Sequence, residues 1–140
     1  MRVDSRDIAI LCSRKIEVCK KIFMNIKSQC SIQRDIPWIS KVEEANKATK
    51  IILVCLKISR LSDDIADAAK TAGFSADQKF FLVIIHTTEP GVDPDISVPM
   101  QDERILDVAN ILYSENVGCY DCQQNNVAKS KISSWFTETK

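Results

Sequence analysis

IILVCL, the stretch Ile51–Leu56, is an unbroken apolar run that is rich in β-branched residues. Such a run is typical of a strand that is buried on both faces of a sheet. Two more runs of this kind flank it along the chain, at Ile8–Cys12 and Lys79–His86. Together the three runs predict the central strands of one sheet whose two faces are both covered.

The segments between and after these runs carry apolar residues at the three- and four-residue spacing of amphipathic helices. Ser13 can cap the first helix, in which Ile16, Cys19, Phe23 and Ile26 share one face. Further helices are expected at Trp38–Lys47, from the N-cap Ser62 to Gly73, at Ile105–Leu112 and at Val127–Phe136.

Two weaker strands complete the pattern, a stub at Ser31–Gln33 and a last strand at Val117–Tyr120, while Pro90–Pro99 reads as a loop. Alternating strands and helices require parallel strands with right-handed crossovers and helices on both faces. We therefore expect an α/β fold, a flavodoxin-like three-layer sandwich with a small, mainly parallel sheet of four to five strands. No repeat or linker divides the chain, so residues 1–140 are expected to form a single domain.

Composition places the chain among ordinary globular proteins, with 45% hydrophobic and 27% charged residues. No apolar run approaches the roughly 20 residues that a membrane-spanning helix needs, and Met1–Asp7 is too polar for a signal peptide. Cys12, Cys19 and Cys55 lie in apolar patterns, where a free cysteine behaves as a small buried hydrophobe. We expect reduced thiols, a cytoplasmic location and no membrane insertion.

Charge is balanced overall but uneven along the chain. Residues 1–60 hold 13 Lys and Arg against 6 Asp and Glu, and residues 61–140 hold 6 against 13, so the halves carry +7 and −7. Surfaces of opposite charge would attract copies of the domain head to tail. The expected basic surface contains Arg14, Lys15, Lys20, Lys21 and Lys27, and the expected acidic surface contains Glu89, Asp93, Asp95, Asp102 and Glu103. Solvated charge without a partner is the alternative.

Ligands of parallel α/β sheets bind beyond the carboxyl ends of the strands. Ser13 follows one expected strand and His86 ends another, so the two could contribute to a ligand site there; helix capping by Ser13 and a structural hydrogen bond of His86 are the alternatives. The turn after Cys12 lacks the glycines that a phosphate or dinucleotide needs, which disfavours a nucleotide fold. A Cys12–His86 dyad is also disfavoured, because an intervening strand would separate the two residues by about 10 Å.

Two further patterns could carry chemistry. Glu89, Asp93 and Asp95 lie in one loop and could bind a hard cation, but their spacing matches no calcium loop, so no metal site is expected. Cys119 and Cys122 form a Cys-x-x-Cys motif before a helix, which can be a redox pair, a metal half-site or incidental thiols. Zinc would require two more ligands, and the chain has one histidine.

The order of these features resembles the Toll/interleukin-1 receptor (TIR) superfamily, in particular its SEFIR branch. The resemblance spans residues 7–90 and rests on the opening strand Ile8–Ser13, the segment Trp38–Ala45 leading into Lys50–Cys55, and Phe80–His86. In that branch an aromatic-led helix ending in an acidic-Ala pair commonly precedes such a strand. The resemblance implies a flavodoxin-like fold and association between related domains.

Two departures from the TIR pattern bear on function. The second strand and the interaction loop that TIR domains place after it are compressed here into Cys30–Pro37. NAD-cleaving TIR members carry a catalytic Glu in the helix after the strand that matches Ile51–Leu56, but Ser62–Ala69 offers only aspartates as acidic residues. The resemblance therefore does not carry enzymatic activity to this chain.

The leading hypothesis is a non-enzymatic protein–protein interaction domain, a signalling adaptor or scaffold that associates with itself or a related domain. It needs no cofactor and no nucleic-acid partner. The alternative is a small enzyme or a nucleotide- or NAD-binding domain with its site at the carboxyl ends of the strands.

Overall fold

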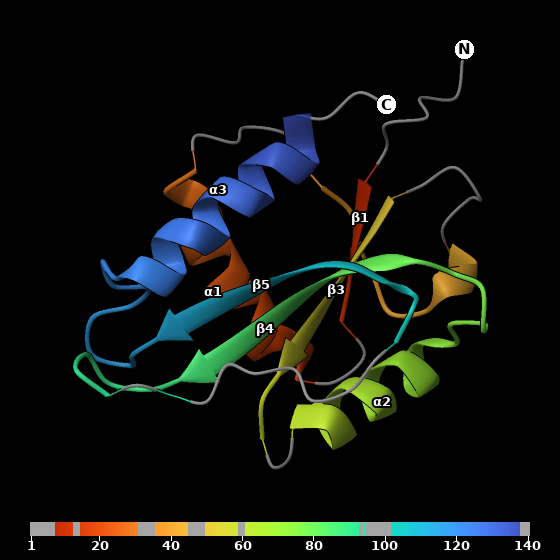
Figure 1. Ribbon diagram of the computed structural model, residues 1–140, viewed down its shortest axis with the longest axis horizontal. Helices are drawn as coiled ribbons and strands as arrows, with labels where there is room; N and C mark the ends of the chain where they lie inside the picture. Colours follow the sequence, from red (N-terminus) through yellow and green to blue (C-terminus); the bar gives the residue numbers. More distant parts are fainter. Residues whose placement is uncertain are drawn as a thin grey trace.

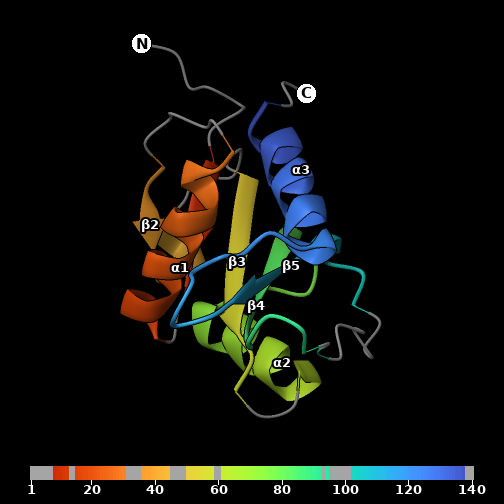
Figure 2. The ribbon, with the colours of Figure 1, turned by 90° about the vertical axis from the view of Figure 1, so that its left-hand side faces the viewer.

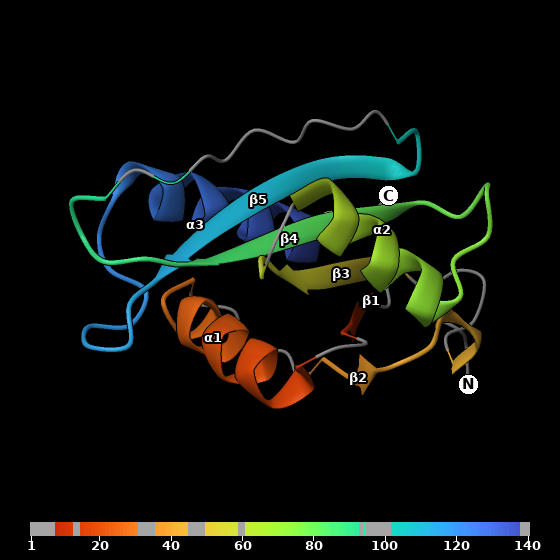
Figure 3. The ribbon, with the colours of Figure 1, turned by 90° about the horizontal axis from the view of Figure 1, so that it is seen from below.

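The sheet is the centre of the fold and contains five strands, all parallel, in the order β2-β1-β3-β4-β5. The strands are β1 (Ile8–Leu11), β2 (Trp38–Ile39), β3 (Lys50–Leu56), β4 (Phe80–Thr87) and β5 (Ile105–Tyr113). A computed structural model provides this fold and describes residues 8–12, 15–30, 36–44, 50–58, 61–92, 94 and 102–137. Figure 3 shows β5 at one edge of the sheet and β2 near the other.

Helices cover both faces of the sheet, as the continuous apolar strands require (Figure 1). The helical elements are α1 (Ile16–Ser28), the 3-10 helix η1 (Val42–Glu44), α2 (Leu61–Ala72) and α3 (Gln123–Thr137). Helices α1 and α3 pack side by side on one face, as Figure 2 shows, and α2 and η1 pack on the other. The expected flavodoxin-like three-layer sandwich is confirmed.

The apolar run at β3 serves two separate cores. Ile52 and Val54 point into the core beneath α1 and α3, whereas Leu53 and Cys55 point into the core beneath α2. Because successive side chains of a strand alternate between faces, a strand between two helical layers has no position at which a polar residue meets water. This is the physical reason that the sequence lacks alternation there.

The expected helix at Trp38–Lys47 is wrong, because Trp38 and Ile39 form strand β2. Of the described part of this segment, residues 38–44, only Val42–Glu44 are helical. Trp38 pairs with Ile10 in parallel register, and its ring packs edge-on against Phe23 of α1, with 5.8 Å between ring centroids. An edge position beside β1 therefore outweighs the helical spacing. The stub expected at Ser31–Gln33 lies outside the described residues.

The expected helix at Ile105–Leu112 is also wrong, since Ile105–Tyr113 is the strand β5 and pairs with β4 along its length. Its apolar residues fit a helical spacing and a strand equally, and the core decides between the two. Every second residue, Ala109, Ile111 and Tyr113, points into the core beneath α3, and this two-residue repeat is that of a strand. Val117 lies in a turn, where Ser114 and Gly118 form a single antiparallel bridge, and not in the expected strand Val117–Tyr120.

Helix ends differ from expectation only in detail. Helix α2 begins at Leu61, one residue before the expected cap Ser62, and ends before Gly73, whose φ of 88° is left-handed. At the start of α1 the cap position belongs to Lys15, which has a φ of 54° and makes no side-chain cap. The expected cap Ser13 lies outside the described residues. No helix in the described part of the chain is long and apolar enough to cross a membrane.

Candidate functional site

The carboxyl ends of β1 and β3 form the topological switch point, the usual ligand site of this fold. A cavity of about 10 Å³ lies here between the beginnings of α1 and α2, and Lys15, Ile58 and Asp64 help to line it. The carboxylate of Asp64 accepts the backbone N–H of Ile58 at 2.8 Å and so serves the loop after β3. A cavity of this size has room for about one water molecule.

Three cysteine thiols lie in the interior behind the switch point. Cys12, Cys19 and Cys55 are all buried. The pKa of Cys19 is strongly raised, first by its side-chain hydrogen bond with Cys12 and then by burial and the neighbouring thiols. A thiol that stays protonated is a poor nucleophile and a poor metal ligand. The described residues contain no group of three or more side chains suited to hold a metal ion.

His86 is 3% exposed, and its Nε2 lies 2.9 Å from Oδ1 of Asn110. Strand β3 separates β1 from β4, as expected, so Cys12 and His86 are not neighbours in the sheet. The alternation along β4 also points His86 toward the α2 face, whereas Cys12 belongs to the core beneath α1. The expected partner of His86 in a ligand site, Ser13, lies outside the described residues. The geometry gives His86 a structural role between two strands.

The expected acidic surface does not form one patch. Glu89 lies beyond the carboxyl end of β4 and accepts a 3.0 Å hydrogen bond from Ser114, whereas Asp102 and Glu103 precede β5 at the opposite end of the sheet. Arg104 binds Asp102 at 2.7 Å, and its hydrogen bonds lower the pKa of Asp102. Asp93 and Asp95 lie outside the described residues.

The expected basic surface is retained in part. Lys20 and Lys21 are exposed on α1 and Lys15 is exposed at its cap position, but Lys27 is only 7% exposed. Arg14 lies outside the described residues. The Nζ of Lys21 lies 6.0 Å from the centroid of the Tyr113 ring.

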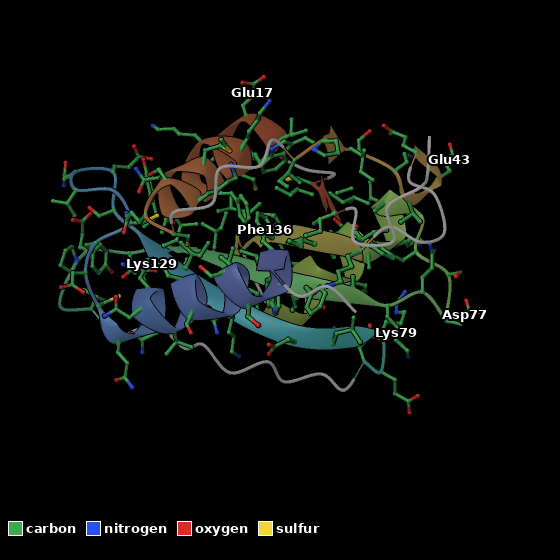
Figure 4. All side chains as sticks on the ribbon, turned by 90° about the horizontal axis from the view of Figure 1, so that it is seen from above. Glu17, Glu43, Asp77, Lys79, Lys129 and Phe136 are labelled. Atoms are coloured by element: carbon green, nitrogen blue, oxygen red, sulfur yellow. The ribbon has the colours of Figure 1, made fainter. Side chains whose placement is uncertain are left out.

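A division of charge between the two helical layers replaces the expected acidic surface. Helices α1 and α3 carry five lysines and one glutamate, for a formal charge of +4, whereas η1 and α2 carry five acidic residues and one lysine, for −4. We call these the basic layer and the acidic layer. Glu43 of the acidic layer points away from the protein (Figure 4), and Asp63 and Asp67 are exposed as well. Charge counted for each predicted helix, rather than for each half of the chain, could have revealed this division.

The Cys-x-x-Cys motif is bound to α1. Cys119 donates its N–H to Oδ1 of Asn25 at 3.1 Å, and its carbonyl accepts a 3.1 Å bond from Gln29. Burial, followed by the neighbouring Cys122, raises the pKa of Cys119 to about 12. Cys122 directly precedes α3 and is half-buried. A protonated, buried Cys119 supports a structural role more than thiol exchange.

The chain matches no protein-family model, and neither a curated protein nor a solved structure is significantly similar to it.

Proposed function

We propose that this domain is a non-enzymatic interaction domain that associates with a second copy, or a related domain, by docking the basic layer of one against the acidic layer of the other. The opposite charges of the two outer layers carry this proposal, and they are +3 and −3 when the buried Lys27 and Asp64 are left out. Complementary potentials steer encounter and select partners. Because the two docking surfaces differ, the contact is head to tail.

The outer surface of α1 has the composition of an interface. Met24 is 43% exposed and lies one helical turn from both Lys20 and Lys21. Ile16 and Val18, which are also exposed large apolar residues, extend this surface toward the start of the helix. An apolar centre with a charged rim is the usual arrangement of a protein contact, with methionine enriched at the centre.

The outer surface of α2 is acidic and complements the basic surface of α1. Asp63 and Asp67 are exposed one turn apart, with the small Ala66 exposed beside them. The absence of a large side chain at Ala66 allows another helix to approach closely. The lysines of α1 could then reach both carboxylates.

The switch-point cavity of about 10 Å³ is too small for a nucleotide or a drug-sized substrate, whose sites usually measure roughly 300–1,000 Å³. This favours binding between proteins over catalysis. A cytoplasmic adaptor or scaffold role in signalling, of the kind that the TIR-like sequence pattern implies, remains the finer prediction.

Charge reversal tests the proposal. We expect Lys20→Glu with Lys21→Glu to weaken self-association at least about tenfold, because two attractive pairs of roughly 0.2–1 kcal/mol each become repulsive. Asp63→Lys with Asp67→Lys should do the same. Mixing the two variants should restore association, since each then meets an oppositely charged surface. Sedimentation velocity over a range of protein and salt concentrations measures this, and added salt should weaken the wild-type contact.

The matched control is Lys79→Glu, compared with Lys20→Glu alone. Lys79 is exposed at the amino end of β4, outside both layers (Figure 4). The Lys79→Glu substitution should leave self-association unchanged. Equal effects of the two single variants, or no recovery in the mixture, would contradict docking between the layers.

A further inference from the structure

A second and larger hollow lies where β5, the edge strand of the sheet, meets α3. Its volume is about 200 Å³. It is lined by Val108 and Asn110 of β5 and by Gln123, Gln124, Val127 and Lys131 of α3. This volume is below the roughly 300 Å³ of the smallest common small-molecule sites, and it suits one amino-acid side chain.

The backbone of β5 determines what this hollow can bind. The carbonyl of Tyr113 accepts the N–H of Thr88, so Tyr113 faces β4. Residues of a strand alternate in the direction of their backbone N–H and C=O groups. Val108, Asn110 and Leu112 therefore direct these groups away from β4, toward the free edge of the sheet.

Side chains already occupy two of these three positions. Asn125 accepts the N–H of Leu112 at 2.8 Å and donates to its carbonyl at 2.9 Å. At Val108 the carbonyl accepts a 2.7 Å bond from Lys131, and the N–H binds the carboxylate of Asp107 at 2.8 Å. Among the described residues, none bonds to the backbone N–H or C=O of Asn110. Within the described part of the chain, the backbone groups of Asn110 thus have no partner, between two residues whose groups do have one.

The hollow is also close to neutral. Lys131 is the one charged residue among the described residues that line it, and its Nζ lies 3.0 Å from Oδ1 of Asp107. Val127 is 46% exposed and gives the hollow an apolar wall, whereas the side chain of Val108 packs against the core beneath α2. Gln123 and Gln124 add amide groups at the rim of the hollow. A backbone donor and acceptor, an apolar wall and neutral amides together suit an extended, uncharged peptide.

We propose that this groove binds an extended peptide segment of a partner protein, one residue of which pairs with the backbone of Asn110 while the adjoining residue places an aliphatic side chain against Val127. The occupied positions at Val108 and Leu112 restrict the pairing to a single residue and so fix its register. The β5 edge of a second copy does not fit. Antiparallel pairing centred on Asn110 would set Val108 against Leu112, whose backbone groups are both taken.

Selection from a displayed library of random heptapeptides against the full chain tests the groove. We expect the selected peptides to share one aliphatic position. A synthetic selected peptide, followed by fluorescence anisotropy, should bind Val127→Arg at least about tenfold more weakly than wild type. Val117→Arg is the matched control, because Val117 is also an exposed valine and lies in a turn outside the groove.

A change in the peptide gives a test that does not depend on the folding of a variant. N-methylation of the residue that pairs with Asn110 removes its backbone donor and should also weaken binding at least about tenfold. Failure to select any peptide, or selected peptides that bind Val127→Arg as tightly as wild type, would overturn the proposal. Binding should persist in Lys20→Glu with Lys21→Glu, which separates this site from association through the layers.

Discussion

At the scale of single residues, the side chain of Asn125 makes the hydrogen bonds to the backbone of Leu112 that a neighbouring strand would otherwise make. Its side chain is 0% exposed and makes three hydrogen bonds, two with the backbone of Leu112 and one with the carbonyl of Tyr120. A carboxamide reproduces the donor and acceptor of a peptide group, so it can satisfy one residue of a strand edge. The same bonds join β5 to the loop that leads into α3.

Replacing Asn125 should therefore destabilise the fold. We expect Asn125→Ala to lower the free energy of unfolding by about 3 kcal/mol, because buried backbone groups lose their partners. The control is Asn126→Ala, at an exposed neighbour whose side chain bonds only to the exposed Asp121 among the described residues, and its effect should stay within about 0.5 kcal/mol. Urea denaturation measures both, and equal losses would rule out this role for Asn125.

The raised pKa of Cys119 makes the free energy of unfolding depend on pH in the alkaline range. Its pKa in the folded protein is about 12, whereas an unfolded thiol ionises near pH 8.5. Between these values the folded state binds one proton more, so the free energy of unfolding falls as pH rises. The slope from this residue is about 1.4 kcal/mol per pH unit.

Removal of the Cys119 thiol should reduce this slope. We expect Cys119→Ala to lose stability less steeply than wild type between about pH 9 and about pH 10 in urea denaturation. Below about pH 8, where the thiol is protonated in both states, the two proteins should show parallel pH dependence. Parallel curves at high pH as well would show that Cys119 is not buried as described.

At the scale of elements, the continuous apolar runs predicted β1, β3 and β4, and the amphipathic spacing predicted α1, α2 and α3. These elements follow from local patterns because their burial repeats with the period of the element itself. Strands β2 and β5 were missed for a different reason. Trp38 and Ile105 acquire their strand conformation from pairing with β1 and β4, which are distant along the chain.

The end of α2 shows a local signal that does hold. Gly73 donates its N–H to Ala69 and Lys70, and its left-handed φ turns the chain so that Phe74 packs on Phe80. We expect Gly73→Ala to cost about 1 kcal/mol, measured by thermal unfolding. A methyl group at this site meets nothing within 4 Å, so the cost is conformational. Gly73→Asn should cost less, since asparagine tolerates this conformation, and an equal cost would point to a packing effect.

At the scale of the whole molecule, the candidate surfaces were only partly predictable. The unequal charge of the two halves correctly marked Lys20 and Lys21 as basic surface residues of α1. The charge of the two halves could not locate the acidic surface that complements α1. That surface depends on the fold, which places α2 on the face opposite α1 and places α3 beside α1. The groove at Asn110 was missed for the same reason, since β5 was expected to be a helix.

The side chains that occupy the edge of β5 also affect the order of folding. Asn125 and Lys131 both belong to α3, which follows β5 in the chain. During synthesis, β5 therefore leaves the ribosome before the residues that cover its edge. An uncovered edge can pair with other chains, and slow parallel sheets prolong that exposure. We therefore expect the docking of α3 to reduce this exposure in the nascent protein, once Asn125 and Lys131 reach the edge.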